Sequence, residues 1–375
     1  MPGVRVLVVD DSVVIRRLVT DALSADPAIE VVGTAANGKI ALTKVAQLRP
    51  DAITMDIEMP EMDGITAVRE LRKSGCKAPI IMFSTLTARG ATATLDALSA
   101  GATDYVTKPA NVGSVQQAMA SVREQLVPLI LALVPHAVVG GRQVPRTSAT
   151  IPGAGGKPAP RALYSGPVKL HDRTGMPNKP VRAVILGSST GGPEALSKLV
   201  KQLIRPLPVP MVITQHMPPV FTAQLAARLD RMTSSEVIEA KEGTTLRPGS
   251  IYIAPGDFHM EFAGNAGVAR VKLTQTPPVN FCRPSVDVMF DAAVKIFGGE
   301  MLAVVLTGMG QDGKEGCRVV LDAGGRTLVQ DEKSSVVWGM PGAVATAGYA
   351  DQILPIEEIA GQITRIVESS QGGRP

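Results

Sequence analysis

The stretch "RAVILGSSTGGPEALSKLV", residues 182–200, decides the fold of the C-terminal half of the chain. An apolar run leads into a loop rich in glycine and serine, and a Pro-Glu pair then begins a segment with helical spacing. A strand, a glycine-rich loop and a helix N-terminus suit a phosphate, because backbone N–H groups and the helix dipole attract anions. Residues 187–191 also match G-x-S-x-G, the turn that exposes a nucleophilic serine. The stretch predicts an α/β fold with either a cofactor cradle or a catalytic serine.

The cofactor interpretation fits the sequence less well. A dinucleotide-binding loop needs G-x-G-x-x-G and an acidic residue that closes the second strand. The glycines here are Gly187, Gly191 and Gly192, and the next apolar run ends in Gln215 and His216. The Gly-Lys-Ser/Thr sequence of a phosphate-binding loop is also missing. These observations favour the serine.

The same alternation of strands and helices extends around this stretch. Apolar runs follow at 210–216, 301–308 and 325–331, with helical spacing between them. Residues 249–262 and 267–275 are typical of a pair of antiparallel strands. We expect a doubly wound α/β domain over residues 181–370, with a small antiparallel addition.

A second α/β domain precedes it, over residues 1–125. Five short apolar runs alternate with helical patterns, at 4–10, 29–35, 51–56, 79–84 and 104–109. This pattern predicts a doubly wound, five-stranded parallel sheet, whose ligands gather at the carboxyl ends of the strands.

Residues 126–180 are predicted to be a linker, because regular patterning stops near residue 134 and Gly, Pro, Ser and Thr become dense. Residues 136–182 hold eight basic residues and one acidic residue, which leaves 30 of the 38 basic and 33 of the 34 acidic residues elsewhere. The net charge of +4 therefore comes from the linker, and the folded parts are slightly acidic. We expect no nucleic-acid partner.

The composition indicates a cytoplasmic globular protein, with 45% apolar and 19% charged residues. No apolar run approaches the ~20 residues of a membrane span, so we expect no membrane insertion. The first residues reach acidic positions too early for a signal peptide. Cys76, Cys282 and Cys317 lack metal-ligand spacing and are expected to be reduced thiols.

Polar residues close four of the N-terminal strands: Asp10 and Asp11, Asp56, Ser84 and Lys108. Parallel strands end at one edge, so the three carboxylates should converge there. Mg²⁺ offsets such repulsion, and a carboxylate beside Mg²⁺, a lysine and a hydroxyl can accept a phosphoryl group. Helix capping would explain Asp10 alone, but it does not explain the whole set.

Residues 4 to about 125 resemble a response-regulator receiver domain, through "VVDDS", "MDIEMPEMDG", "FSTLT" and "YVTKP". The resemblance implies that Asp56 is the phospho-acceptor and that Asp10, Asp11 and Asp56 hold Mg²⁺. It further implies that Ser84 is the switch hydroxyl, Tyr105 the aromatic switch and Lys108 the cation that contacts the phosphate.

Three C-terminal residues follow apolar runs and should share one sheet edge: Ser189, His216 and Asp312. Serine, histidine and aspartate together perform acyl transfer, and the glycine-rich loop around Met309 can donate backbone N–H groups to an oxyanion.

Taken singly, each of the three could be structural. His259, with Asp257 as its orienter, competes with His216 for the role of base, whereas His136 and His171 are poor candidates because they lie at or within the linker.

Residues 181 to about 368 are similar to the catalytic domain of the chemotaxis protein-glutamate methylesterase and glutamine deamidase family. The resemblance is carried by "GSSTGGPEAL", "ITQHMPP", "IYIAPGDFHM", "PPVNFCRPSVDVMF", "LTGMGQDG" and "GMPGAV". It implies Ser189 as nucleophile, His216 as base, Asp312 as its orienter and Met309 as an oxyanion donor. Thr190 is expected to help position the histidine. Ser188 departs from the family, which usually has alanine there.

The resemblance implies a phosphorylation-activated esterase that releases methanol from glutamate γ-methyl esters on chemoreceptors and deamidates particular receptor glutamines. A chemotaxis histidine kinase would supply the phosphoryl group, and the esterase reaction itself would need no cofactor. We hypothesise that the unphosphorylated receiver blocks the Ser189 edge. Two alternatives stay open: a receiver fused to a non-catalytic binding module, and a receiver-controlled DNA-binding regulator, against which no helix-turn-helix pattern follows the linker.

Overall fold

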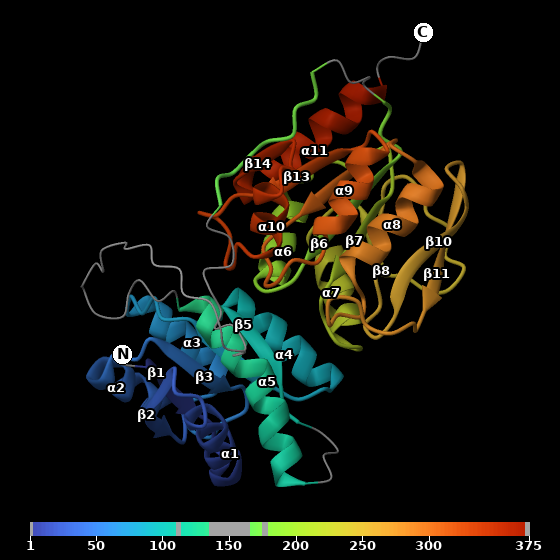
Figure 1. Ribbon diagram of the computed structural model, residues 1–375. Helices are drawn as coiled ribbons and strands as arrows, with labels where there is room; N and C mark the ends of the chain where they lie inside the picture. The colour runs from blue at the N-terminus through green and yellow to red at the C-terminus, as the bar shows by residue number, and fades with distance from the viewer. Residues whose placement is uncertain (1–2, 110–113, 135–165, 175–178, 372–375) are drawn as a thin grey trace. The chain divides into compact units, whose positions relative to one another are not determined.

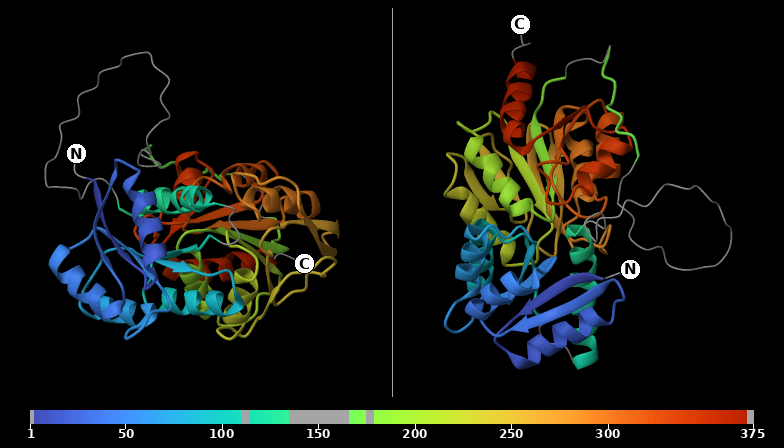
Figure 2. Two further views of the ribbon diagram at one scale, coloured as in Figure 1. Left: turned by 90° about the horizontal axis from the view of Figure 1, so that it is seen from below. Right: turned by 90° about the vertical axis from the view of Figure 1, so that its left-hand side faces the viewer.

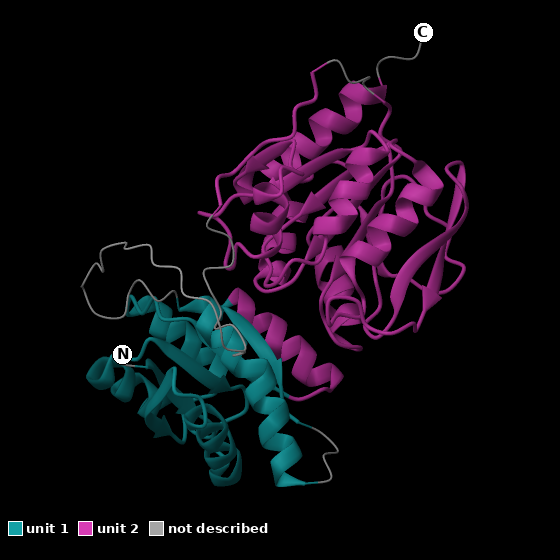
Figure 3. Ribbon diagram, in the orientation of Figure 1, with its two compact units in different colours: residues 1–84, 100–165 teal, residues 85–99, 166–375 magenta. Residues whose placement is uncertain are grey.

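The computed structural model describes residues 3–109, 114–134, 166–174 and 179–371 (Figure 1). It divides into two compact units, residues 1–84 with 100–165 and residues 85–99 with 166–375 (Figure 3). Helix α4 (Ala88–Ser99) is thus grouped with the second unit, although it follows the fourth strand of the first.

The N-terminal unit holds the predicted five-stranded parallel sheet. Its strands are β1 (Val4–Val9), β2 (Ile29–Ala35), β3 (Ala52–Asp56), β4 (Ile80–Ser84) and β5 (Asp104–Thr107). They run in the order β2-β1-β3-β4-β5, and every neighbouring pair is parallel. The order reverses between β1 and β3, which is where a doubly wound sheet opens a crevice for ligands.

The helices of this unit begin at side chains that cap their free N–H groups. Ser12, Asn37 and Asp63 each accept a hydrogen bond from the backbone at the start of a helix. These helices are α1 (Val13–Ser24), α2 (Gly38–Leu48) and α3 (Gly64–Lys73), and α5 (Val115–Leu133) follows the sheet. Helix α1 packs beside α5, and α2 packs beside α3.

The C-terminal unit is built on a seven-stranded parallel sheet in the order β14-β13-β12-β6-β7-β9-β8. The strands are β6 (Ala183–Ser188), β7 (Met211–Gln215), β8 (Glu236–Glu239), β9 (Ser250–Ile253), β12 (Met301–Val305), β13 (Arg326–Gln330) and β14 (Gln352–Leu354). The central strands β12, β6 and β7 are continuously buried, as parallel strands covered by helices require. Strand order reverses between β6 and β12, so the ligand crevice is expected at the carboxyl ends of these two strands.

Helices cover both faces of this sheet, as Figures 1 and 2 show. They are α6 (Gly192–Gln202), α7 (Phe221–Asp230), α8 (Val286–Phe297), α9 (Lys314–Asp322), α10 (Met340–Thr346) and α11 (Ile356–Gln371). Helix α6 packs beside α11, and α8 packs beside α9. The predicted doubly wound domain is therefore confirmed.

The antiparallel addition is smaller than the sequence predicted. Strands β10 (His259–Asn265) and β11 (Val268–Thr274) form a two-stranded hairpin. Strand β9 instead lies in the main sheet, parallel to β7 and β8, so the assignment of residues 249–262 to one hairpin strand was wrong. A turn at residues 254–258 separates the two strands, and Asp257 adopts a left-handed backbone there (φ 66°). Strands β8 and β14 are short and were not predicted.

The predicted linker, residues 126–180, has ordered parts at both ends. Helix α5 continues to Leu133. Further on, Leu170 pairs with Ala350, and the His171 N–H donates to the Ala350 carbonyl at 2.8 Å. Long-range bonds of this kind leave no periodic signal in a sequence, so the composition could not reveal them. Most of the remaining linker and His136 lie outside the described residues.

Across the described ranges, no helix combines the length and the apolar character needed to cross a membrane.

Candidate active site and acidic site

Three carboxylates meet at the carboxyl edge of the N-terminal sheet. Asp10 and Asp11 follow β1, Asp56 ends β3, and their oxygens lie within 4.8 Å of one another. Lys108 Nζ lies 3.0 Å from Asp10 Oδ2 and 2.8 Å from Asp56 Oδ1. The predicted convergence of these side chains at the sheet's reversal point is present.

The charges in this cluster are strongly coupled. Burial raises the pKa of Asp56 to about 6, with the Asp10 charge adding to the rise and the Lys108 hydrogen bond opposing it. Burial alone would lower the pKa of Lys108, but its bonds to Asp56 and Asp10 raise it. Oxygen ligands with excess negative charge fit Mg²⁺, which prefers carboxylates and keeps several waters.

The other predicted residues of this site lie on the neighbouring strands. Ser84 ends β4 and is buried, and its carbonyl accepts the Lys108 N–H at 2.6 Å. Tyr105 is half-buried on β5. Their roles in switching remain predictions.

Ser189 lies just beyond β6, at the carboxyl edge of the C-terminal sheet. Its N–H donates to the Thr307 carbonyl at 3.0 Å, and its own carbonyl accepts the Gly192 N–H at 2.7 Å. Gly191 caps helix α6 with a left-handed backbone (φ 73°), and a β-carbon there would lie 2.5 Å from Val336. The loop thus needs glycine to turn sharply. The Ser189 side chain is half-buried and has no hydrogen-bond partner among the described residues.

The two adjacent serines are distinguished by burial. The Ser188 side chain is fully buried, and its hydroxyl donates to Gln215 Oε1 at 2.6 Å. The Gln215 side chain in turn donates from Nε2 to the Ser189 carbonyl at 3.0 Å. Ser188 therefore shapes the loop, and Ser189 is the hydroxyl that can meet a substrate.

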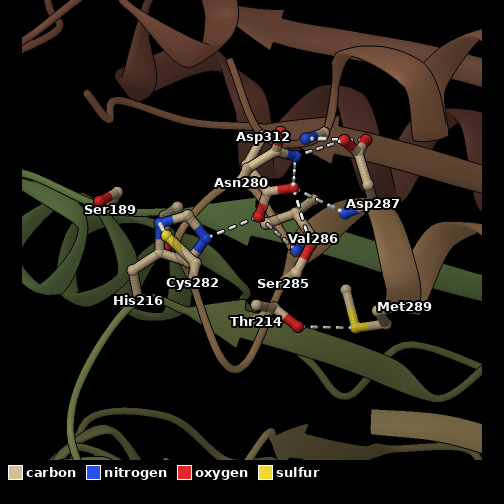
Figure 4. Close-up of polar contacts among 12 residues, drawn as sticks. Ser189, Thr214, His216, Asn280, Cys282, Ser285, Val286, Asp287, Met289 and Asp312 are labelled. Atoms are coloured by element: carbon tan, nitrogen blue, oxygen red, sulfur yellow. Dashed lines mark hydrogen bonds and ion pairs between the residues drawn. The ribbon is translucent and has the colours of Figure 1, made fainter. Parts of the chain in front are cut away.

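His216 follows β7 and is bonded to Asp312. His216 Nε2 lies 2.8 Å from Asp312 Oδ2, which leaves Nδ1 as the ring nitrogen free of the carboxylate. Figure 4 shows Ser189 on the side of the ring away from Asp312, where Nδ1 lies. The three predicted residues are brought together at the ends of β6, β7 and β12.

Asp312 is held by the first turn of helix α8 (Figure 4). The Val286 N–H donates to its Oδ2 at 2.6 Å, and the Asp287 N–H donates to its Oδ1 at 3.1 Å. Ser285, the residue that caps α8, donates its hydroxyl to Asp312 Oδ1 at 2.9 Å rather than accepting from its own helix. Free N–H groups and the helix dipole favour a negative charge here, so this carboxylate is fixed in place as an anion.

The pKa values of the pair follow from these bonds. Burial alone would lower the pKa of His216, but the hydrogen bonds to Asp312 and Cys282 and the charges of these two groups together outweigh burial and raise that pKa. Burial opposes ionisation of Asp312, yet the bonds from His216 and the backbone lower its pKa far below the usual range. The neighbouring carboxylate therefore stabilises the imidazolium that forms once His216 has taken up a proton.

A further polar shell surrounds Asp312. Asn280 donates from Nδ2 to Asp312 Oδ1 and to Asp287 Oδ2, both at 2.8 Å. Asp287 Oδ1 accepts the N–H groups of Gly313 at 3.0 Å and Gly316 at 2.7 Å. Burial and the nearby Asp312 charge raise the pKa of Asp287 to about 6. Asn280 thus ties together two carboxyl groups that would otherwise repel.

Thr190 follows Ser189 in the chain, and Met309 follows Gly308, where an added β-carbon would lie 2.8 Å from Ser189. The loop of Met309 follows β12 and is tied down by hydrogen bonds from the Gly339 and Met340 N–H groups to the Gly308 carbonyl. Within the described ranges the Met309 N–H has no hydrogen-bond partner, which suits a donor to an oxyanion. The Thr190 carbonyl accepts the Thr307 hydroxyl at 2.9 Å. The supporting roles of both residues remain predictions.

The competing histidine has a structural role. His259 is fully buried, with Nε2 at 3.2 Å from the Pro277 carbonyl and Nδ1 accepting the Ser285 N–H at 3.2 Å. Asp257 bonds to Arg283 instead of orienting this histidine. His171 Nδ1 lies 2.9 Å from Asp351, away from Ser189.

Several groups that hold the site could not be assigned this role from the sequence. They are Gln215, Asn280, Cys282, Ser285 and Asp287. Four of them lie within "PPVNFCRPSVDVMF", a stretch that carries the family resemblance but whose local pattern assigns them no role. The Cys282 contact, with Sγ 3.4 Å from His216 Nδ1, joins residues far apart in the chain and has no such signal.

The fold and the two sites define a class of protein: a receiver-type domain with a carboxylate cluster, joined to an α/β domain that carries a Ser–His–Asp arrangement. The family model for the response regulator receiver domain matches residues 6–120, and the model for the CheB methylesterase matches residues 184–363. Both expected resemblances are thus confirmed.

Curated relatives agree over almost the full length. A protein-glutamate methylesterase/protein-glutamine glutaminase of a Nocardioides species is 58% identical, covering 97% of this chain and 96% of its own. That of Trichodesmium erythraeum is 46% identical, covering 97% and 99%. The chain belongs to this family of receiver-linked CheB methylesterases. The crystal structure of the Thermotoga maritima CheB methylesterase catalytic domain is 41% identical, covers 50% of this chain and 98% of its own, and has a TM-score of 0.48.

Proposed function

We propose that this protein hydrolyses γ-methyl esters of glutamate side chains on chemoreceptors, releasing methanol, and deamidates particular receptor glutamines. One observation carries the proposal: Ser189, whose hydroxyl has no hydrogen-bond partner among the described residues, lies on the Nδ1 side of His216, whose Nε2 is bonded to Asp312 at 2.8 Å. The names of the relatives supply the substrate class.

The proposed reaction has two halves. Ser189 Oγ attacks the ester or amide carbonyl carbon while His216 Nδ1 takes the hydroxyl proton, and the Met309 N–H donates to the resulting oxyanion. Collapse of this tetrahedral intermediate breaks the bond to the methoxy or amino group. That group takes the proton from His216 and leaves as methanol or ammonia. Water, deprotonated by His216, then attacks the acyl-enzyme and releases glutamate and free Ser189. One acyl-enzyme therefore serves both substrates.

The N-terminal unit supplies the regulation. We propose that Asp56 accepts a phosphoryl group from a chemotaxis histidine kinase, with Asp10, Asp11 and Asp56 holding Mg²⁺. Mg²⁺ would neutralise charge on the phosphoryl group during transfer. Lys108, already bonded to Asp56, would contact the phosphoryl oxygens. Phosphorylation would shift the population towards the active esterase through Ser84 and Tyr105. Receptor substrates on the inner side of the membrane would place the protein in the cytoplasm.

Methanol release from methyl-labelled receptor membranes tests this function, measured with and without a small-molecule phosphodonor and Mg²⁺. We expect release that rises with the phosphodonor, loses that rise in Asp56→Asn, and vanishes in Ser189→Ala. Labelling of Ser189 by an organophosphate provides an independent measure of an assembled triad. Release that persists in Ser189→Ala would overturn the proposed nucleophile.

A further inference from the structure

A tight turn at residues 279–282 lies next to the Ser–His–Asp arrangement. The Val279 N–H donates to the Cys282 carbonyl at 3.1 Å, and the Cys282 N–H donates to the Val279 carbonyl at 2.9 Å. Its two central residues, Asn280 and Phe281, are both left-handed, with φ values of 52° and 65°. Residues with a β-carbon adopt this conformation at an energetic cost, and strain of this kind concentrates at functional sites.

Side chains of two turn residues, and of the residue that follows the turn, anchor it to the surrounding structure. Asn280 points inward and bonds to Asp287 and Asp312. Cys282 Sγ lies 3.4 Å from His216 Nδ1. The next residue, Arg283, donates from Nε to Asp257 at 3.0 Å. These bonds hold the turn at a fixed position beside the reacting histidine.

Phe281 is left as the outward-pointing side chain of this anchored turn. It is 103% exposed, whereas five of the other phenylalanines are at most 8% exposed. Those five are Phe83, Phe221, Phe262, Phe290 and Phe297. A fully exposed aromatic ring on an anchored turn has its full apolar surface available, and such residues are the usual anchors of protein–protein interfaces.

The surface next to the turn is hollowed. A groove of about 350 Å³ is lined in part by Val279, by Phe262 of β10 and by Asp287 and Ala292 of α8. The turn therefore borders the groove at one end and contacts His216 at the other.

We propose that Phe281 is a docking residue for the protein substrate, packing against an apolar side chain on the receptor helix that carries the ester. This inference rests on the proposed function. The reacting methyl ester is small and uncharged, and the folded parts of the chain are slightly acidic, so neither supplies strong attraction to a receptor. Binding energy must come from contacts outside the reacting group.

The test compares wild type with Phe281→Ser, Phe281→Leu and Ile204→Ser. Ile204 is 96% exposed and follows the far end of helix α6 from Ser189, so its variant is a matched control for loss of an exposed apolar side chain. Two quantities are measured: kcat and KM for methanol release from methylated receptor membranes, and the rate at which a small organophosphate labels Ser189.

We expect Phe281→Ser to raise KM about 30-fold, the factor that corresponds to about 2 kcal/mol at an interface hot spot, while kcat and the labelling rate are kept. Phe281→Leu should recover most of the affinity, and Ile204→Ser should match wild type. An unchanged KM in Phe281→Ser would overturn the proposal. A parallel fall in labelling would also overturn it, because the turn would then support the triad rather than the substrate.

Failure of the proposed function gives a different result. Wild-type protein that labels with the organophosphate but releases no methanol from any methylated receptor would overturn the receptor assignment, and with it the partner proposed for Phe281.

Discussion

Replacing Asp312 by asparagine changes the group that holds His216 in its reactive tautomer. The carboxylate of Asp312 accepts five hydrogen bonds, and every partner is a donor: His216 Nε2–H, the N–H groups of Val286 and Asp287, the Ser285 hydroxyl and the Asn280 amide. An asparagine side chain keeps one acceptor oxygen and puts an NH₂ group in place of the other. Whichever way the amide turns, its NH₂ group faces at least two of these donors.

The orientation with the least conflict places the NH₂ group towards His216, which can respond by moving its proton from Nε2 to Nδ1. Nδ1 then carries a proton and cannot accept one from Ser189. We expect kcat for methanol release to fall about 10⁴-fold, the loss known for a triad histidine held in the wrong tautomer. This factor corresponds to about 5 kcal/mol of activation free energy.

The measurement is single-turnover methanol release from methylated receptors, with organophosphate labelling of Ser189 alongside it. Thermal unfolding checks that the variant is folded, because unpaired buried donors cost about 1–3 kcal/mol each. Asp322→Asn is the matched control: this carboxylate is 66% exposed at the end of α9 and pairs with Arg318 alone among the described residues, so the variant should have wild-type activity. A loss smaller than tenfold in a folded Asp312→Asn protein would refute the tautomer argument.

Three further predictions follow from the contacts around the site. Alkylation of Cys282 with iodoacetamide should abolish most esterase activity, because the Cys282 sulfur lies 3.4 Å from His216 Nδ1. The Cys282→Ala variant should resist this inactivation. A variant that is inactivated as readily as wild type would contradict the prediction. Ser188→Ala should lower the free energy of unfolding by about 1 kcal/mol, through the lost bond to Gln215, yet keep methanol release; loss of release would show that Ser188 acts in the reaction. Burial and a neighbouring carboxylate raise the pKa of Asp287 to about 6, so the folded state binds this proton more tightly than the unfolded state does. Its contribution to stability should therefore decrease as pH rises from about 4 to above 6, and urea unfolding of Asp287→Asn should lack that decrease.

Local patterns in the sequence determined much of the fold. Apolar runs with polar residues at their ends predicted the five strands of the first sheet and four strands of the second. Parallel strands end at one edge, so the same patterns placed Asp10, Asp56 and Lys108 together. They also brought Ser189, His216 and Asp312 to one edge of the second sheet, whose central strands are adjacent. The periodicity of apolar residues is enough to predict which side chains gather at one edge of a parallel sheet.

Tertiary structure alone decided how these side chains are held and which rival residues are structural. His216 and His259 follow similar local patterns, and their burial and partners separate them physically: His259 is enclosed between Pro277 and Ser285, whereas His216 is bonded to Asp312. The sequence gives no hint that the first turn of α8 would bind the Asp312 carboxylate, because that contact joins segments 25 residues or more apart. Such contacts depend on how elements pack, and packing leaves no repeating pattern along the chain.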